Sequence, residues 1–380
     1  MNVPVPFETA VFVTQPLLPA LDRMASRLQQ IWDAKWLTND GAQTRELSGA
    51  LAAFLKIPHV SLTCNGTAGL LIACRALQLK GEVIVTPFTF SATVHALAWA
   101  GLTPVFADID PVSMTLSPEA AERAITPRTS ALLGVHVYGI PCDVEGLARV
   151  AEPRGLKLLY DAAHAFGVAT GAGPISSFGD LSMFSFHATK LFHSAEGGAL
   201  ATRDPDLAER FRLLRNFGIR GEFEVPEIGV NAKMSELHAA LGAEVLPLVP
   251  AEQGRRAVIA QHYRERLGAL ATLSLPEGMS VARPSYQYFP VRVMKDFAGG
   301  GGRDRLYEAL RGLNILVRKY FFPLCSRYPT YSALPSASPA NLPEAHRAAE
   351  ECLCLPFHGG LSAEDVDRIC DAIVYIDRTG

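Results

Sequence analysis

Lys190 is the residue in this sequence with the most specific chemical potential. It stands in SFHATKLFHSAEGGAL, after a strongly apolar run and between Thr189 and Leu191. In such a setting a lysine could lose its proton and become a nucleophile. Gly197 and Gly198 would let the backbone turn tightly close to a bound group. Most lysines are solvated surface charges, so the interpretation depends on what else the sequence places nearby.

A second candidate site is TCNGTAGLLIACRAL, where a turn of small residues leads directly into a helical pattern. Thr67 and Ala68 fall in the first turn of that helix. Free amides and the helix dipole there favour an anion, and a dianionic phosphate fits. The alternative is an ordinary helix start capped by Asn65 or Thr67.

The segment LLYDAAHAFG puts Asp161 at the end of an apolar strand and His164 three residues later. A buried aspartate without a cationic partner is costly, so Asp161 implies a specific partner such as a protonated heterocycle. The alternatives are a helix cap for Asp161 and a hydrogen-bonded core imidazole for His164.

Phe90 follows a strand in EVIVTPFTFSAT and could lie flat on an aromatic ring, although core packing is the commoner role of phenylalanine.

The elements that would position these residues follow an α/β pattern from about residue 45 to 200. Apolar runs alternate with amphipathic segments such as AGLLIACRALQL and VEGLARVAEPRG, which indicates a mainly parallel sheet covered by helices. About seven strands are expected, in HVSLTC, EVIVTPF, TPVFADI, SALLGVHVYG, LKLLYDAA, SMFSFH and GGALATR. Ligands bind at the carboxyl edge of such sheets.

After Arg203 the pattern changes to longer helical runs and then to a mixture of helix and short strands. We therefore expect a large domain over residues 1–247 and a smaller α+β domain over 248–380, the latter interrupted by a loop at AGGGG, residues 298–302.

Composition excludes several classes of protein. The 380 residues are 49% hydrophobic and 19% charged, with a net charge of −3 and no Lys/Arg-rich run, so neither nucleic acid nor a membrane surface is an expected partner. No signal peptide or long apolar span is evident, which predicts a cytoplasmic protein. The seven scattered cysteines predict reduced thiols, and the histidine and cysteine spacing predicts no metal site.

The chain resembles the sugar aminotransferases of the DegT/DnrJ/EryC1/StrS family, a branch of the fold-type I enzymes that use pyridoxal 5'-phosphate. The resemblance runs almost from end to end, through WLTNDG, CNGTAGL, TPFTFSAT, FADIDP, HVYGIPCDV, YDAAHAFG, SFHATK, EGGAL, NFGI, GVNAKMSELHAALG, RKYFFPL and CLPFHGGL.

The resemblance implies roles for the candidate residues. Lys190 would carry the cofactor as a Schiff base and move the proton, and Asp161 would pair with the pyridine nitrogen. His164 would lie near the phenolic oxygen, and Phe90 would stack on the ring. Thr67, Ala68 and Ser185 would hold the phosphate, with Asn231 reaching in from the partner subunit of a homodimer.

The family pattern is less informative about the substrate. Tyr320 and His358 match positions that line the substrate site in relatives, although both could be packing residues. Arg318 is a possible diphosphate ligand, and His187 is a variable position beside the strand end. Many relatives have Pro-Leu-His where this chain has Cys325, so a role for that histidine does not carry over.

The implied reaction moves an amino group from L-glutamate to a keto sugar nucleotide. The branch resembled most closely aminates C4 of dTDP-4-keto-6-deoxyglucose, and amination at C3 or of UDP- or GDP-linked sugars is the alternative. A dehydratase of the same family is disfavoured because those relatives have histidine in place of Lys190. A regulator without turnover would need a DNA-binding module or a basic patch, and neither is found.

Overall fold

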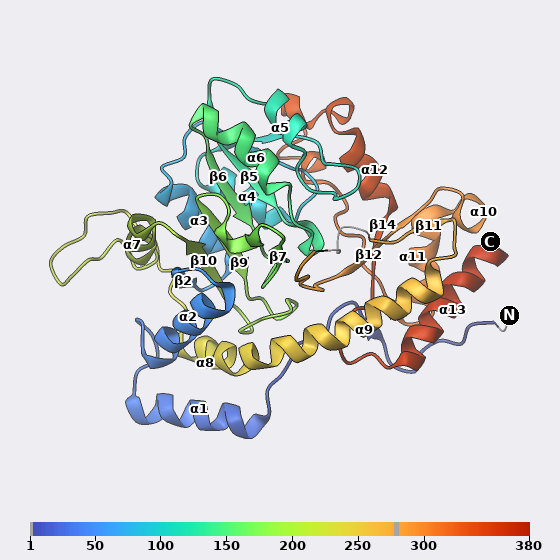
Figure 1. Cartoon of the computed structure of the whole chain (residues 1–380), viewed down its shortest axis with the longest axis horizontal. Coiled ribbons are helices and arrows are strands. Elements are labelled where there is room, and N and C mark those ends of the chain that lie inside the picture. The colour runs from blue at the N-terminus through green and yellow to red at the C-terminus, as the bar shows by residue number, and fades with distance from the viewer. Residues whose placement is uncertain (1–2, 277–280) are drawn as a thin grey trace.

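A seven-stranded sheet forms the centre of the molecule in the computed structural model, which describes residues 3–276 and 281–380. The strands lie in the order β2-β10-β9-β6-β5-β3-β4 (Figure 1). Their bounds are β2 His59–Thr63, β3 Glu82–Val85, β4 Thr103–Phe106, β5 Thr129–Val135, β6 Lys157–Asp161, β9 Leu181–Ser185 and β10 Gly198–Thr202. Five of them lie within a predicted segment, and β5 and β9 each begin one residue before theirs, so the expected α/β fold with a mainly parallel sheet is confirmed.

The sheet is parallel from β4 to β9, and β10 runs antiparallel to both of its neighbours. Because side chains alternate along a strand, Val83 and Val85 of β3 face one apolar core while Ile84 faces the other. Both faces are buried, which explains why these strands read as continuous apolar runs.

Helices cover the two faces. One face is packed by α3 (Gly66–Ala76), α4 (Ser91–Trp99) and α7 (Pro205–Leu214). The other is packed by α2 (Ala42–Leu55), α5 (Pro118–Arg123), α6 (Val144–Ala151) and α8 (Glu236–Val245). The loops at the carboxyl ends of the parallel strands therefore meet at one edge.

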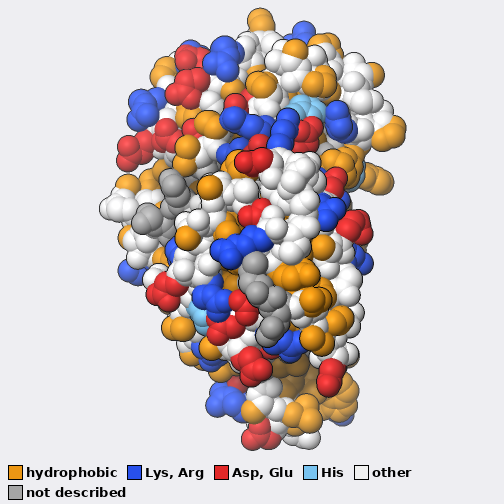
Figure 2. Space-filling model, turned by 90° about the vertical axis from the view of Figure 1, so that its right-hand side faces the viewer, with side chains coloured by type: hydrophobic (Ala, Val, Ile, Leu, Met, Phe, Trp, Pro, Cys, Tyr) orange, Lys and Arg blue, Asp and Glu red, His pale blue; other side chains and the backbone are white. Residues whose placement is uncertain are grey.

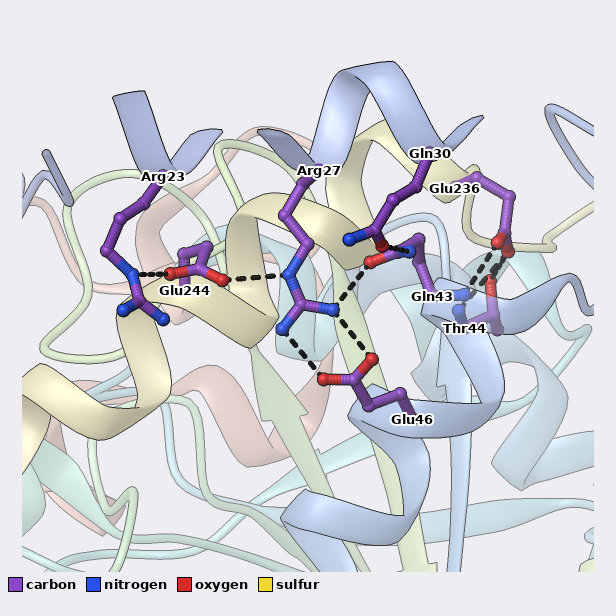
Figure 3. Close-up of polar contacts among 8 residues, drawn as sticks. All are labelled: Arg23, Arg27, Gln30, Gln43, Thr44, Glu46, Glu236 and Glu244. Carbon is purple, nitrogen blue, oxygen red and sulfur yellow. Dashed lines mark hydrogen bonds and ion pairs between the residues drawn. The ribbon is translucent and has the colours of Figure 1, made fainter. Parts of the chain in front are cut away.

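Helix α1 (Leu21–Ala34) lies outside these layers, below α8 in Figure 1. Polar contacts attach it. Arg23 and Arg27 donate from Nε to the two carboxylate oxygens of Glu244 at 2.6 and 2.8 Å, and Arg27 also pairs with Glu46 at 2.6 Å (Figure 3). The same figure shows Glu236 accepting from the amide of Thr44 at the start of α2, at 3.2 Å. These contacts join α1, α2 and α8.

The C-terminal part has its own core around a three-stranded sheet in the order β11-β12-β14. Its elements are β11 Leu273–Ser274, β12 Phe289–Val293, α10 Phe297–Gly300, α11 Gly302–Gly312, β13 Ile315–Leu316, α12 Pro343–Glu351, β14 Cys352–Leu355 and α13 Ala363–Thr379. The segment AGGGG spans the end of α10 and the start of α11, and Ala298, Gly299, Gly300 and Gly302 all have positive φ, so the helical path is interrupted there by left-handed turns.

Two features bear on the division into domains. The expected boundary falls in the short turn Leu246–Leu248, between α8 and the long helix α9 (Val249–Leu267) that runs toward the C-terminal part (Figure 1). Near the N-terminus, β1 (Val11–Phe12) pairs with β13. The division at 247/248 stays a prediction, and Phe7 and β1 pack on the C-terminal part.

Acidic and basic side chains are interspersed on the end of the molecule that Figure 2 shows. Within the described ranges, no helix is long and apolar enough to cross a membrane. The described cysteines are all free thiols, and all but Cys64 are buried.

Candidate functional site

A cavity of about 400 Å³ lies at the carboxyl edge of the central sheet. Its wall includes residues at or just beyond the ends of β5, β6 and β9, together with residues from the C-terminal part such as Tyr288 and Arg318. Of the residues predicted from the sequence, it brings together Thr67, Phe90, Asp161, His164, Ser185, His187, Lys190, Arg318 and Tyr320. The residues expected at this edge therefore line one cavity, as a shared site requires.

The start of α3 forms one part of the wall, with Asn65, Gly66 and Thr67. Asn65 is the helix cap and accepts from the amide of Ala68 at 2.8 Å, so one of the two caps considered is present. A side chain on Gly66 would meet Ser185 Cβ at 3.1 Å, and one on Gly198 would meet the Gly66 nitrogen at 2.8 Å. The glycine at 198 is thus needed for close approach of β10 to this turn.

Asp161 ends β6 and is only 5% exposed. Its carboxylate accepts from Thr93 Oγ1 at 2.8 Å and from the amide of Ala163 at 3.0 Å. Burial raises the pKa of Asp161, while these hydrogen bonds and the charge of Lys190 oppose the rise. Two neutral donors do not fully compensate a buried carboxylate, so the site favours a further cationic group beside it.

His164 is buried, and its ring is stacked on Phe321 with 5.9 Å between centroids and 4° between planes. Its Nδ1 accepts from the amide of Tyr138 at 3.2 Å. Burial, with a smaller contribution from the charge of Lys190, holds the pKa of His164 well below its usual value. The ring is therefore neutral and carries its proton on Nε2, which makes it a hydrogen-bond donor in the cavity wall.

Lys190 follows β9 and its amide donates to the carbonyl of His187 at 2.8 Å. Burial lowers the pKa of the Lys190 ammonium to about 8, against the opposing charge of Asp161. A substantial fraction of this amine is therefore neutral near physiological pH, as a nucleophile or proton carrier requires.

Phe90, His187, Tyr320 and Arg318 lie where the cavity meets solvent. Phe90 caps the start of α4 and is 58% exposed. His187 Nδ1 lies 2.8 Å from Thr189 Oγ1, and its Nε2 lies 3.8 Å from a carboxylate oxygen of Glu196. Arg318 is exposed and Tyr320 is half-buried. These groups are open to an incoming substrate.

Three predicted residues are not in the cavity wall. The amide of Ala68 is occupied by Asn65, as described above. His358 is buried near Arg256 and Glu252, and burial lowers its pKa to about 4. His358 does not line this cavity, and its expected place in the substrate site stays a prediction. Asn231 is exposed and its side-chain oxygen accepts from Lys233 Nζ at 2.9 Å, so a role in this subunit's own cavity is not supported.

The sequence analysis missed several residues in the wall: Thr89, Thr93, His136, Glu196, Tyr288 and Phe321. Thr93 is the most informative, because its hydroxyl lies 2.8 Å from Asp161 and 2.9 Å from Thr89. The four-residue spacing of Thr89 and Thr93 at the start of a helix was an available signal. The pairing of Thr93 with Asp161 spans 68 residues of sequence, and no local signal predicted it.

Three comparisons with known proteins add to this geometry. The model of the DegT/DnrJ/EryC1/StrS aminotransferase family matches residues 21–374. The dTDP-4-amino-4,6-dideoxy-D-glucose transaminase of Escherichia coli is 42% identical over 360 residues, which cover 94% of this chain and 96% of that protein. The GDP-perosamine synthase of Caulobacter vibrioides is 31% identical and covers 94% of this chain and 98% of its own length.

Among solved structures, DesI in the presence of its TDP-sugar product has a TM-score of 0.94 and 39% sequence identity, over 99% of this chain and 95% of that one. Similarity of this extent covers both the sheet and the C-terminal part that faces it.

Proposed function

Because the chain belongs to the DegT/DnrJ/EryC1/StrS aminotransferase family, we propose that it transfers the amino group of L-glutamate to C4 of dTDP-4-keto-6-deoxy-D-glucose. The product is dTDP-4-amino-4,6-dideoxy-D-glucose. The enzyme is a pyridoxal-phosphate-dependent sugar-nucleotide transaminase. The observation that carries the choice of substrate is the 42% identity to a transaminase named for this product, over nearly the whole of both chains.

The cavity wall fits pyridoxal phosphate. The buried Asp161 carboxylate lacks a full counter-charge and suits a protonated pyridine nitrogen. The neutral His164 keeps a donor on Nε2 that suits the phenolic oxygen. The first turn of α3 and Ser185 offer donors for a phosphate. A volume of about 400 Å³ accommodates a ring of this size.

We assign roles on that basis. When bound, the cofactor supplies an electron sink for the carbon that loses its proton. Lys190 would hold the cofactor covalently and would carry the proton in each half of the reaction, since its lowered pKa lets it both accept and donate. Asp161 would keep the pyridine nitrogen protonated, and Thr93 donates to the carboxylate that would do so.

Phe90 would cover one face of the ring from the start of α4, with Thr67 and Ser185 at the phosphate. Arg318, Tyr320 and His187 would meet the substrate at the open side. Ala68 remains a candidate phosphate contact only if its amide stops donating to the side chain of Asn65.

The position of the new amine in the product tests the proposed specificity for C4. We would incubate the holoenzyme with L-glutamate and either the 3-keto or the 4-keto dTDP-6-deoxyhexose, and locate the new amine by NMR. The proposal predicts amine at C4 from the 4-keto sugar only. An amine at C3, or turnover confined to UDP- or GDP-linked sugars, would reject this substrate and leave the aminotransferase assignment intact.

We also propose that the enzyme is a homodimer in which Asn231 enters the partner's cavity. Support comes from apolar side chains exposed on the loop that projects beyond α7 at the left of Figure 1, where Phe223 is 92% and Ile228 is 79% exposed. Exposed apolar groups in such number mark an interaction surface. Asn231 lies at the base of this loop, bridged to Asn216.

Mixed subunits test the dimer. Combining inactive Lys190→Ala subunits with inactive Asn231→Ala subunits should restore part of the activity, because one hybrid site then contains both residues. Absence of activity in verified heterodimers would rule out the cross-subunit role of Asn231.

A further inference from the structure

The backbone of Lys190 lies between β9 and β10, outside any helix or strand. Its amide donates to the carbonyl of His187 at 2.8 Å, and His187 Nδ1 accepts from the amide of Thr189 at 3.3 Å. These two bonds leave the carbonyl of Thr189 and the amide of Leu191 to be bonded from elsewhere. Leu191 is completely buried, and a buried backbone group without a partner is costly, so this turn needs a partner from outside.

Gln287 supplies that partner with one side chain. Its Oε1 accepts from the amide of Leu191 at 2.7 Å, and its Nε2 donates to the carbonyl of Thr189 at 3.0 Å. The carboxamide therefore spans Lys190, because it bonds the residue before the lysine and the residue after it. Gln287 is only 1% exposed, so water does not compete for these bonds and could not replace them if the side chain were removed.

Gln287 is held in turn by the C-terminal part of the chain. It lies two residues before β12, a strand of the three-stranded sheet. The carbonyl of the preceding Tyr286 accepts from Arg256 of α9 at 3.1 Å, and the buried Arg256 guanidinium pairs with Glu252 at 2.7 Å. The turn that carries Lys190 therefore takes its position from a segment 96 to 98 residues further along the chain.

The same segment also holds His164. Ser285 Oγ donates to the carbonyl of His164 at 2.8 Å, and the Tyr288 ring packs edge-on against the imidazole with 4.9 Å between centroids. One short segment thus contacts both His164 and the turn of Lys190, which fixes their relative position. A displacement of about 1 Å at a reacting group can cost about 100-fold in rate, so such contacts bear on function.

We propose that Gln287 is a positioning residue for Lys190: it holds the backbone on both sides of the lysine and so fixes the point from which the amine reaches into the cavity. The inference rests on the role of Lys190 in the proposed function. The lysine has to hold the cofactor and, when released from it, carry the proton, and both tasks start from the same backbone position. A glutamine that only joined two parts of the chain would affect stability without affecting the lysine.

The experiment uses Gln287→Met, which keeps the length of the side chain and removes both hydrogen bonds. In apoenzyme, hydrogen exchange of the Leu191 amide, followed by mass spectrometry, should become faster by about fivefold or more. Capture of added pyridoxal phosphate, followed by absorbance, should slow by roughly tenfold because the amine is less well placed. Gln287→Asn keeps an amide but is one methylene shorter, so it cannot reach both partners and should give the same two changes if the methionine variant does not fold.

The matched control is Gln43→Met. Gln43 is also a buried glutamine bonded at both ends, since it accepts from Arg27 at 2.9 Å and donates to Gln30 at 3.1 Å, but it joins α1 to α2 and does not line the cavity (Figure 3). Its replacement should lower the melting temperature and leave both the exchange of the Leu191 amide and the capture of cofactor unchanged.

The inference is overturned if folded Gln287 variants exchange the Leu191 amide at the rate of the unmodified apoenzyme, or if they capture cofactor as fast as Gln43→Met does. Either result leaves the proposed function standing when the unmodified enzyme aminates the keto sugar. Conversely, faster exchange and slower capture in a chain that aminates no dTDP-sugar support the role of Gln287 and reject the proposed substrate.

Discussion

The buried sheet edge of this site and the exposed wall opposite it are built differently. Asp161 and His164 are buried and bonded to neighbouring groups, and burial has shifted the pKa values of Asp161, His164 and Lys190. Arg318 and Phe322 on the other side are exposed and come from a segment beyond the sheet. The contrast separates buried groups with shifted pKa values at the sheet edge from exposed groups that an incoming ligand can reach, as the proposed function requires.

Loss of the lysine should have the largest effect. Lys190→Ala removes both the covalent attachment and the proton carrier, so turnover should fall below detection while circular dichroism stays unchanged. Measuring activity together with the absorbance of bound cofactor checks this. Turnover at a rate comparable to the unmodified enzyme would assign the chemistry to another residue, and Lys157→Ala is the control.

Replacing the carboxylate should have the next largest effect. Asp161→Asn keeps the shape and removes the charge, so cofactor should still bind while the rate falls by about tenfold or more, equivalent to about 1.4 kcal/mol of barrier. A smaller loss in steady-state rate would make Asp161 a structural residue and weaken the contrast between the two sides.

Thr93 tests whether the carboxylate must be held in place. Thr93→Val removes the hydroxyl that lies 2.8 Å from Asp161 and should lower the rate by roughly 3- to 10-fold, as expected for about 1 kcal/mol of a lost hydrogen bond. Thr93→Ser keeps the hydroxyl and should retain most of the rate. Equal losses in both variants would contradict a positioning role.

The smallest expected effect is a shift in the pH at which the rate of cofactor capture reaches its midpoint. The neutral Lys190 amine captures cofactor, so the rate of capture by apoenzyme should rise with pH to a midpoint near 8, the lowered pKa of Lys190. The Asp161 charge raises this pKa, so Asp161→Asn should move the midpoint to lower pH. Stopped-flow absorbance measures it, and a midpoint unmoved or raised in the variant would show that the two groups are not coupled.

The residues at the sheet edge were easier to predict from the sequence than those of the exposed wall opposite it. The seven strands were identifiable because both faces of the sheet are buried, which leaves continuous apolar runs ending at Asp161 and just before Lys190. The local sequence pattern is sufficient to identify a candidate functional residue when that residue lies at the end of such a strand or shortly after it.

Long-range contacts were not predictable in the same way. The pairing of Thr93 with Asp161 and the placement of His358 beside Glu252 and Arg256 each depend on packing between segments far apart in the sequence. Helix α1 was absent from the predicted elements because its attachment rests on charged pairs with Glu244 and Glu46 rather than on a wide apolar face.

The most direct test of the aminotransferase account follows the cofactor absorbance of the holoenzyme through the two half-reactions separately. L-Glutamate alone should convert the absorbance of lysine-bound pyridoxal phosphate to that of the pyridoxamine form. Addition of dTDP-4-keto-6-deoxyglucose, without further glutamate, should then restore the original spectrum in proportion to the amino sugar formed. A spectrum that glutamate does not change, or that the keto sugar does not restore, would contradict the account.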